Sequence, residues 1–250
     1  MIYIKSAGEV AKMRRSGRIT ANIFEVLKPH IKPGVSTAEL DKIAKEYILR
    51  SEAKPSFLNY NGFPASICSS INDVVIHGIP SHSKILKDGD IISIDVGVIK
   101  DGYHSDAART YAVGNISDEA ARLIDVTEKS FFEGIRYAKQ GERLFSISAA
   151  IQDYVESAGY SIVKNYCGHG VGRNLHEDPE IPNYGKFGHG NRLMRNMTLA
   201  IEPMVNMGGA ATRVLSDGWT VVTQDKSYAA HYENTIVIAD YFNRTVSGFC

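Results

Sequence analysis

Carboxylates stand inside apolar, strand-like stretches at several points of this 250-residue chain. Asp95 lies in Ile-Ile-Ser-Ile-Asp-Val-Gly-Val-Ile, Glu202 lies in Leu-Ala-Ile-Glu-Pro-Met-Val, and Glu233 precedes a β-branched run. A buried ionised carboxylate is costly unless a cation or a metal ion compensates it. One such acid alone would more often be a buried ion pair or a side chain on a hydrated strand face. Because no basic residues alternate with these acids, we expect metal ions to compensate them.

A fourth acid, Asp106, is tied to Asp95 by a tight turn. Asp101-Gly102 between two strand-like segments is typical of a two-residue β-hairpin loop. This turn sets Asp106 opposite Gly97, so that Asp95 and Asp106 are diagonal neighbours on one face of the ribbon. Diagonal positions lie about 7–8 Å apart at the backbone, and two carboxylates there can converge on one metal ion.

One imidazole is expected near these acids. His169 lies in Cys-Gly-His-Gly-Val-Gly-Arg, where the glycines would let the backbone turn tightly and bring the ring close to a site. Four carboxylates with one imidazole suit Mn, Fe(II), Co or Zn better than Ca or Mg. The glycine spacing differs from that of phosphate-binding loops. His176-Glu177-Asp178-Pro179 begins like the HExxH zinc motif, but Glu180 stands where the second histidine belongs.

His77 and His176 are the remaining candidates for chemistry. A lone histidine is usually structural, but both of these flank turn residues near predicted strand ends, where a substrate could reach them. Two carboxylate-bridged metal ions supply hydrolytic chemistry by activating water and polarising a carbonyl. A histidine beside that carbonyl would donate a hydrogen bond to the developing oxyanion.

Periodicity and turn signals predict helices and strands in two similar series. Capping boxes at Ser6/Glu9 and Ser36/Glu39 begin the first two helices, which end near Pro29 and after Ile48. Two more helices are expected at about 117–140 and 144–158. Strands are expected at 91–99, 103–113, 161–166, 197–205, 219–223 and 231–239, with a Gly/Asn/His-rich loop over 168–192.

The order helices, strands, helices, strands indicates an internal duplication. A shift of 107 residues lays Lys32-Pro33-Gly34 on Lys139-Gln140-Gly141 and Asp95 on Glu202 without a gap. We therefore expect one catalytic domain over 1–250, built from similar halves of about 1–115 and 116–250. Each half contributes an acid to a shared centre.

Composition excludes several other classes of protein. The 28 basic and 28 acidic residues balance, which argues against nucleic-acid binding as the main function and against a DNA partner. Three unpaired cysteines suit a reducing compartment, and no signal peptide or membrane span is visible, so we expect a cytoplasmic protein. A basic cluster on the first helix is best interpreted as a solvated face. The alternative is contact with an acidic partner such as ribosomal RNA. The basic cluster consists of Lys12, Arg14, Arg15 and Arg18.

Five short motifs together resemble type I methionine aminopeptidases of peptidase family M24, in order and over essentially the whole chain. They are Ile76-His77-Gly78-Ile79-Pro80, Ile94-Asp95-Val96-Gly97 with Ser105-Asp106, Gly168-His169-Gly170-Val171-Gly172, Ile201-Glu202-Pro203 and Tyr232-Glu233-Asn234-Thr235. The resemblance implies the α+β pita-bread fold, in which two pseudo-symmetric halves surround a curved antiparallel sheet with helices outside. The resemblance is to the short bacterial form of the family, which carries no zinc-binding extension before the catalytic region.

The resemblance also implies a role for each candidate residue. Asp95 would bind one divalent metal ion through both oxygens, Asp106 and Glu233 would bridge two ions, and His169 and Glu202 would complete the second. Glu202 would also be the base, while His77 and His176 would contact substrate. The pocket for the methionine side chain would be formed by Tyr60, Phe63, Cys68 and Trp219, with Phe57 nearby.

The implied reaction is removal of the initiator methionine from nascent polypeptide N-termini, preferentially when the second residue is small, by a monomer. Two alternatives are another pita-bread peptidase, such as an X-Pro enzyme, and a binding protein that has lost its metals. Many relatives carry Thr where this chain has Gly97, which predicts a change in metal affinity. Phe57 and Leu175 are unusual residues for the pocket.

Overall fold

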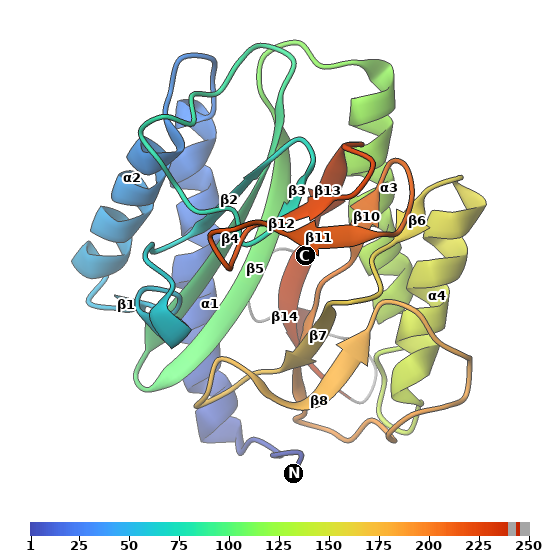
Figure 1. The fold of residues 1–250 in the computed structure, drawn as a ribbon. Helices are drawn as coiled ribbons and strands as arrows, with labels where there is room; N and C mark the ends of the chain where they lie inside the picture. The colour runs from blue at the N-terminus through green and yellow to red at the C-terminus, as the bar shows by residue number, and fades with distance from the viewer. Residues whose placement is uncertain (240–243, 246–250) are drawn as a thin grey trace.

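Four long helices occur in two consecutive pairs along the described chain. The computed structural model describes residues 1–239 and 244–245, so Cys250 and the end of the expected second half lie outside it. In Figure 1, α1 and α2 lie on one flank of the molecule, and α3 and α4 lie on the other. The helices are α1 (Ala7–Leu27), α2 (Thr37–Arg50), α3 (Asp118–Ile135) and α4 (Leu144–Ser157), with 3-10 turns η1 (Lys28–His30) and η2 (Tyr60–Gly62).

Local hydrogen bonds explain where these helices begin and end. The capping box of α1 is complete, because the Ser6 hydroxyl accepts from the Glu9 N–H and the Glu9 carboxylate accepts from the Ser6 N–H. At α2 only the Ser36 side of the box forms. The prediction that α3 reaches about residue 140 is wrong. It ends at Ile135, because the following residues turn and Lys139 forms a β-bridge with Ala239.

One large antiparallel sheet runs through the molecule, and in the view of Figure 1 its strands appear between the two helix pairs. Its strand order is β1-β4-β5-β14-β9-β7-β8, with β2 also paired to β4 and β15 to β14. β4 and β9 thus flank the central β5–β14 pair. The strands are β1 (Lys54–Pro55), β2 (Cys68–Ile71), β4 (Ile91–Lys100), β5 (Tyr103–Ala112), β7 (Cys167–Gly170), β8 (Glu177–Pro182), β9 (Thr198–Ile201), β14 (Glu233–Val237) and β15 (Arg244–Thr245).

The predicted register of the β4–β5 hairpin is confirmed. Gly97 pairs with Asp106 and Asp95 pairs with Ala108, as the two-residue turn requires. Both turn residues, Asp101 and Gly102, have positive φ angles of 54° and 77°. This is the backbone shape that joins strands with a right-handed twist most tightly.

Two small sheets complete the fold. One has the order β13-β10-β6 and the other the order β11-β12-β3. The chain enters the first small sheet directly from the large one, at Glu202-Pro203 between β9 and β10. It crosses again at Tyr232, between β13 and β14. The strands are β3 (Val74–Ile76), β6 (Ser161–Ile162), β10 (Met204–Asn206), β11 (Thr212–Val214), β12 (Val221–Thr223) and β13 (Ala229–His231).

These crossings correct several expected strands. The segments 197–205 and 231–239 each divide into two strands that belong to different sheets. Pro203 has no N–H to continue a ladder, which explains the first break. The expected strands 161–166 and 219–223 are shortened to β6 and β12. The expected loop 168–192 is wrong in part, because it contains most of β7 and all of β8.

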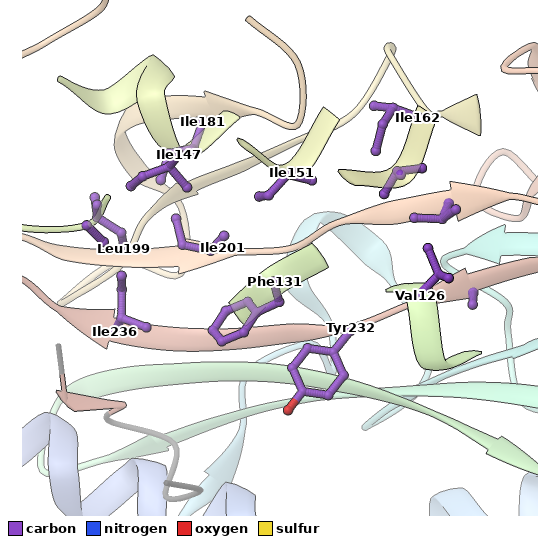
Figure 2. Close-up of a cluster of buried hydrophobic side chains, with 14 of the residues drawn as sticks. Val126, Phe131, Ile147, Ile151, Ile162, Ile181, Leu199, Ile201, Tyr232 and Ile236 are labelled. Atoms are coloured by element: carbon purple, nitrogen blue, oxygen red, sulfur yellow. The ribbon is translucent and has the colours of Figure 1, made fainter. Parts of the chain in front are cut away.

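The helices bury one face of the large sheet. Ile92, Ile94 and Val96 of β4 pack in one cluster with side chains of α1 and α2. Figure 2 shows the corresponding cluster of α3 and α4 against β9 and β14, with Phe131 beside Tyr232. Because side chains alternate along a strand, Asp95 lies on the opposite face, away from the helices. No helix in the described residues combines the length and the apolar character that crossing a membrane requires.

Candidate active site

Strand pairing brings the acids of different strands into one row. Ala108 of β5 pairs with Asp95 of β4 on one side and with Glu233 of β14 on the other. Glu202 directly follows β9, whose last residue, Ile201, pairs with the neighbour of Glu233. The four acids therefore come from the four central strands of the sheet, on the face that the helices leave open.

His169 reaches this row from β7. One ligand atom from each of Asp106, His169 and Glu233 lies within 4.8 Å of the other two. The Nε2 atom of His169 is 3.6 Å from Oε1 of Glu202 and 3.9 Å from Oδ2 of Asp106. The charge of Asp106 raises the pKa of the Asp95 carboxyl group, so these two acids are close neighbours. The structure thus brings all five proposed ligands together.

The carboxylates in this cluster are short of partners. One oxygen each of Asp95, Asp106 and Glu233 is buried without a hydrogen-bond partner. Burial raises the pKa of Asp106 to about 7, and burial together with neighbouring acids raises the pKa values of Asp95 and Glu233 well above their ordinary range. Lone pairs that nothing satisfies are what a bound cation would compensate. The donor set therefore fits divalent metal ions.

A buried arginine lies near the cluster, and its charge lowers the pKa of Glu233 against the larger effects of burial and neighbouring acids. The Arg109 guanidinium donates to the main-chain oxygens of Ala108 and Glu233, at 2.7 and 2.6 Å, and to Oδ1 of Asn234. It also lies over the Tyr232 ring. Its described hydrogen bonds go to main-chain and amide oxygens.

The glycines beside His169 serve a different purpose from the one expected. His169 lies within β7 rather than in a tight turn, and Gly168 and Gly170 have no positive φ. A Cβ atom at Gly168 would collide with the main-chain oxygen of Ala200, and one at Gly170 with that of Asp178. The glycines let β8 and β9 approach β7 closely enough to hold the imidazole over the acids.

A cavity of about 200 Å³ opens onto the cluster of four acids and His169. Its floor is acidic and its walls are largely aromatic and aliphatic. Leu175 lines the wall, as expected, and one wall residue, Asn61, had no predicted role in the pocket. The lining residues are Phe57, Tyr60, Asn61, Phe63, Cys68, His77, Asp95, Asp106, His169, Leu175, His176, Glu202, Trp219 and Glu233. All the predicted substrate-pocket residues thus line one cavity.

His77 and His176 approach this cavity from different loops. His77 has a φ of 58°, an uncommon conformation for a residue other than glycine, and such strain is concentrated at functional sites. Its ring meets Trp219 edge-on. His176 lies with its ring centroid 4.3 Å from that of His169. Its Nδ1 is 2.7 Å from the Tyr60 hydroxyl.

Phe57 and Ser56 occupy the space that a side chain at Gly97 would fill. A Cβ atom at this position would lie 2.6 Å from Cε1 of Phe57 and 2.7 Å from Cβ of Ser56. Both distances are shorter than van der Waals contact. The Phe57 ring therefore covers β4 beside Asp95 and Asp106, in the space that a side chain at position 97 would otherwise occupy.

Sequence reasoning assigned no role to His231. This residue is 2% exposed, and its Nε2 lies 3.8 Å from Oε2 of Glu202. The local sequence Ala-Ala-His-Tyr carries no signal of such a role. The contact depends on the pairing of Met204 in β10 with His231 in β13, which is a long-range feature of the fold.

Comparisons with known proteins agree with this geometry. The model for metallopeptidase family M24 matches residues 11–240. A relative from Clostridium acetobutylicum, named methionine aminopeptidase, is 55% identical over 240 residues, which cover 96% of each chain. The crystal structure of methionine aminopeptidase from Thermotoga maritima is 41% identical with a TM-score of 0.98, and the match covers all of both chains.

A more distant structure shares the fold alone. The prolidase from Pyrococcus furiosus is 20% identical with a TM-score of 0.81, and the match covers 98% of this chain and 65% of the prolidase. The fold is therefore the mixed α+β pita-bread fold that methionine aminopeptidases share with prolidases. On this fold and these matches, the chain belongs to metallopeptidase family M24, among its methionine aminopeptidases.

Proposed function

We infer that this chain is a metallo-aminopeptidase that removes the initiator methionine from nascent polypeptides. Relatives at 47–55% identity over 96% of the chain are named methionine aminopeptidases. The observation that carries the inference is the convergence of four acids and one imidazole on the floor of a largely apolar cavity. Such a floor suits metal-assisted hydrolysis, and such walls suit an apolar side chain.

We propose that two divalent metal ions are held by five residues of the floor. Asp95 would bind one ion, Asp106 and Glu233 would bridge both, and His169 and Glu202 would bind the second. The unsatisfied oxygens of Asp95, Asp106 and Glu233 support this assignment. Mixed carboxylate and imidazole ligands favour Mn, Fe(II), Co or Zn. When bound, the ions would supply Lewis acidity and lower the pKa of water.

The protein groups would then move protons and orient the substrate. In this proposal Glu202 accepts the proton of the attacking water and passes it to the amine of the leaving peptide. His77 and His176 donate hydrogen bonds to the oxygen of the scissile carbonyl as it becomes tetrahedral. The 2.7 Å contact with the Tyr60 hydroxyl supports a fixed orientation for the His176 ring.

Methionine would be selected by the apolar wall of the cavity. Phe63 is 3% exposed and Cys68 is 5% exposed, and the Phe63 ring packs edge-on against Trp219. A pocket of this kind accepts an unbranched thioether chain, while each methylene of difference is worth about 1–3 kcal/mol. We propose Tyr60, Phe63, Cys68 and Trp219 as its main residues, with Phe57 at its edge, and a preference for small second residues.

Three further features belong to the same proposal. The chain would act as a cytoplasmic monomer and form one domain of two related halves. The 107-residue offset supports the duplication, because it carries α2 at 37–50 onto α4 at 144–157. Contact with the ribosome would fall to Arg14 and Arg18, since Arg15 pairs with Asp101 and Lys12 lies over the Tyr103 ring.

Peptide cleavage tests the proposed reaction. Purified protein should release free methionine from Met-Ala-Ser and Met-Gly peptides in the presence of Mn²⁺ or Co²⁺, and should leave X-Pro peptides intact. Glu202→Ala should release none, because it removes both a ligand and the base. Cleavage of X-Pro peptides in preference to Met-Ala-Ser, or normal turnover by Glu202→Ala, would overturn the assignment.

A further inference from the structure

His231 approaches Glu202 from behind the cavity. The two oxygens of the Glu202 carboxylate face different imidazoles: Oε1 lies 3.6 Å from Nε2 of His169, and Oε2 lies 3.8 Å from Nε2 of His231. Glu202 lines the cavity on the substrate side, and His231 is not among the residues that line it. The imidazole of His231 therefore contacts the carboxylate without reaching the space that a substrate would enter.

The main chain of His231 is held in place within strand β13. Thr110 accepts a hydrogen bond from the His231 N–H at 3.0 Å and donates one to its main-chain oxygen at 2.9 Å. His231 also pairs with Met204, two residues after Glu202. Strand β13 thus fixes the backbone from which the imidazole reaches the carboxylate.

The Nε2 atom of His231 is buried and has no hydrogen-bond partner among the residues that the structure describes. An unsatisfied buried nitrogen destabilises the folded protein, and such atoms often have a functional explanation. Oε2 of Glu202 lies 3.8 Å from this nitrogen and is able to accept a hydrogen bond. Hydrogen bonds at catalytic groups are often long in the free protein and tighten when substrate is bound.

We propose that His231 is a positioning residue, which orients the Glu202 carboxylate by donating a hydrogen bond from Nε2 to Oε2. This rests on the proposed role of Glu202 as metal ligand and base. A hydrogen bond from His231 to Oε2 of Glu202 leaves Oε1 directed toward His169 and the proposed metal ions. Groups that hold a metal ligand in its orientation typically contribute about 10- to 100-fold to metal affinity or activity.

Three substitutions separate a hydrogen-bond donor from a packing residue. His231→Leu keeps the volume and removes the donor, whereas His231→Gln keeps an N–H that can reach the carboxylate. Met204→Leu is the matched control, because Met204 is the buried cross-strand partner of His231 and carries no donor. Thermal melting verifies that each variant is folded. If the leucine variant does not fold, His231→Phe replaces it, with a planar ring that lacks an N–H.

The measurements are methionine release from Met-Ala-Ser and calorimetric binding of Mn²⁺ to chelator-treated protein. The donor-free variant should lose about 10-fold or more in kcat and in Mn²⁺ affinity, with KM changed by less than about twofold. His231→Gln and Met204→Leu should stay within about threefold of the unmodified chain in both. Wild-type kcat and Mn²⁺ affinity in the donor-free variant would overturn the proposal, as would a glutamine variant equally impaired.

The same assay distinguishes this inference from the proposed function. If the unmodified chain releases no methionine with any metal, the proposed function fails, and the calorimetric Mn²⁺ affinities still test His231. If the unmodified chain is active and the donor-free variant equals it in kcat and Mn²⁺ affinity, only the role of His231 fails.

Discussion

Gly97 shows how the face of the large sheet that the helices leave uncovered depends on the size of a single residue. It lies two residues from Asp95 and pairs with Asp106, so its position is on the side of the metal ligands. The Phe57 ring and the Ser56 Cβ occupy the space above it. The glycine is therefore required by the close approach of the segment that forms one wall of the cavity.

Replacing Gly97 by alanine should disturb that wall. The added methyl group would push the Ser56–Phe57 segment outward, and overpacking of this kind costs about 1–3 kcal/mol of stability. Since Phe57 lines the cavity, KM for Met-Ala-Ser should rise as well. Denaturant unfolding and steady-state kinetics measure the two effects. Gly8→Ala is the control, because nothing lies within 4 Å of a Cβ there. Unchanged stability and KM in Gly97→Ala would contradict this account.

Single residues differ in how well sequence predicts their role. Asp95 and Glu202 are conspicuous because an acid in an apolar strand needs a physical explanation. His231 is not conspicuous, since histidine is compatible with many buried and exposed environments. Its place behind Glu202 depends on the β10–β13 pairing, which joins segments that are separated by a long stretch of chain. Local patterns do not encode such a contact.

At the scale of secondary structure, β7 shows why the strand that carries His169 is rich in glycine. The main-chain oxygens of Ala200 and Asp178 lie where Cβ atoms at Gly168 and Gly170 would be. Any side chain at either position would separate β7 from a neighbouring strand. The imidazole would then move away from Asp106 and Glu202.

Gly170→Ala should therefore reduce metal binding and catalysis together. The displaced His169 would bind the ion less well, and misplacement by about 1 Å can lower the rate by about 100-fold. Mn²⁺ calorimetry and methionine release measure both quantities. Gly8→Ala tests whether any glycine substitution has this effect, because nothing lies within 4 Å of a Cβ atom at Gly8, in α1. A Gly170→Ala protein with normal Mn²⁺ affinity would show that the close packing does not position His169.

Sequence predicts some of these elements better than others. The hairpin 91–112 follows from its two-residue turn, because the turn alone sets the register. The paired helices follow from their caps and apolar periodicity. β7 and β8 were expected to be loop, because glycine and charged residues obscure the strand pattern and the pairing with β9 is not local. The breaks at Glu202-Pro203 and Tyr232 arise where the chain changes sheets, and of these only the proline gave a local signal.

At the scale of the whole molecule, the buried acids should determine how stability depends on pH. Burial raises the pKa of Asp106 to about 7, and burial together with repulsion from neighbouring acids raises the pKa values of Asp95, Glu202 and Glu233 well above their ordinary range. The folded state thus keeps protons that the unfolded chain releases near pH 4. Burial lowers the pKa values of His169 and His231 to about 3, and these histidines oppose the trend only below about pH 6.5.

Chelator-treated protein should therefore lose stability as pH rises from about 6.5 through the pKa of Asp106 at about 7. The expected slope is roughly 1 kcal/mol per pH unit for each acid that stays protonated when folded. Added Mn²⁺ should flatten this slope, because the cation compensates the ionised carboxylates. Urea unfolding at several pH values, with and without Mn²⁺, measures it. A chelated protein whose stability rises over this range would show that the acids are already compensated by protein groups.

The central claim is that these acids and His169 form a metal centre that drives removal of N-terminal methionine. The direct measurement is a titration of chelator-treated protein with Mn²⁺ or Co²⁺, in which methionine release from Met-Ala-Ser is followed against equivalents of metal. The account predicts negligible activity without metal and a rise that saturates by about two equivalents, in line with a carboxylate-bridged pair of ions. Methionine release that is independent of added metal, or absent with Mn, Fe(II), Co and Zn alike, would contradict it.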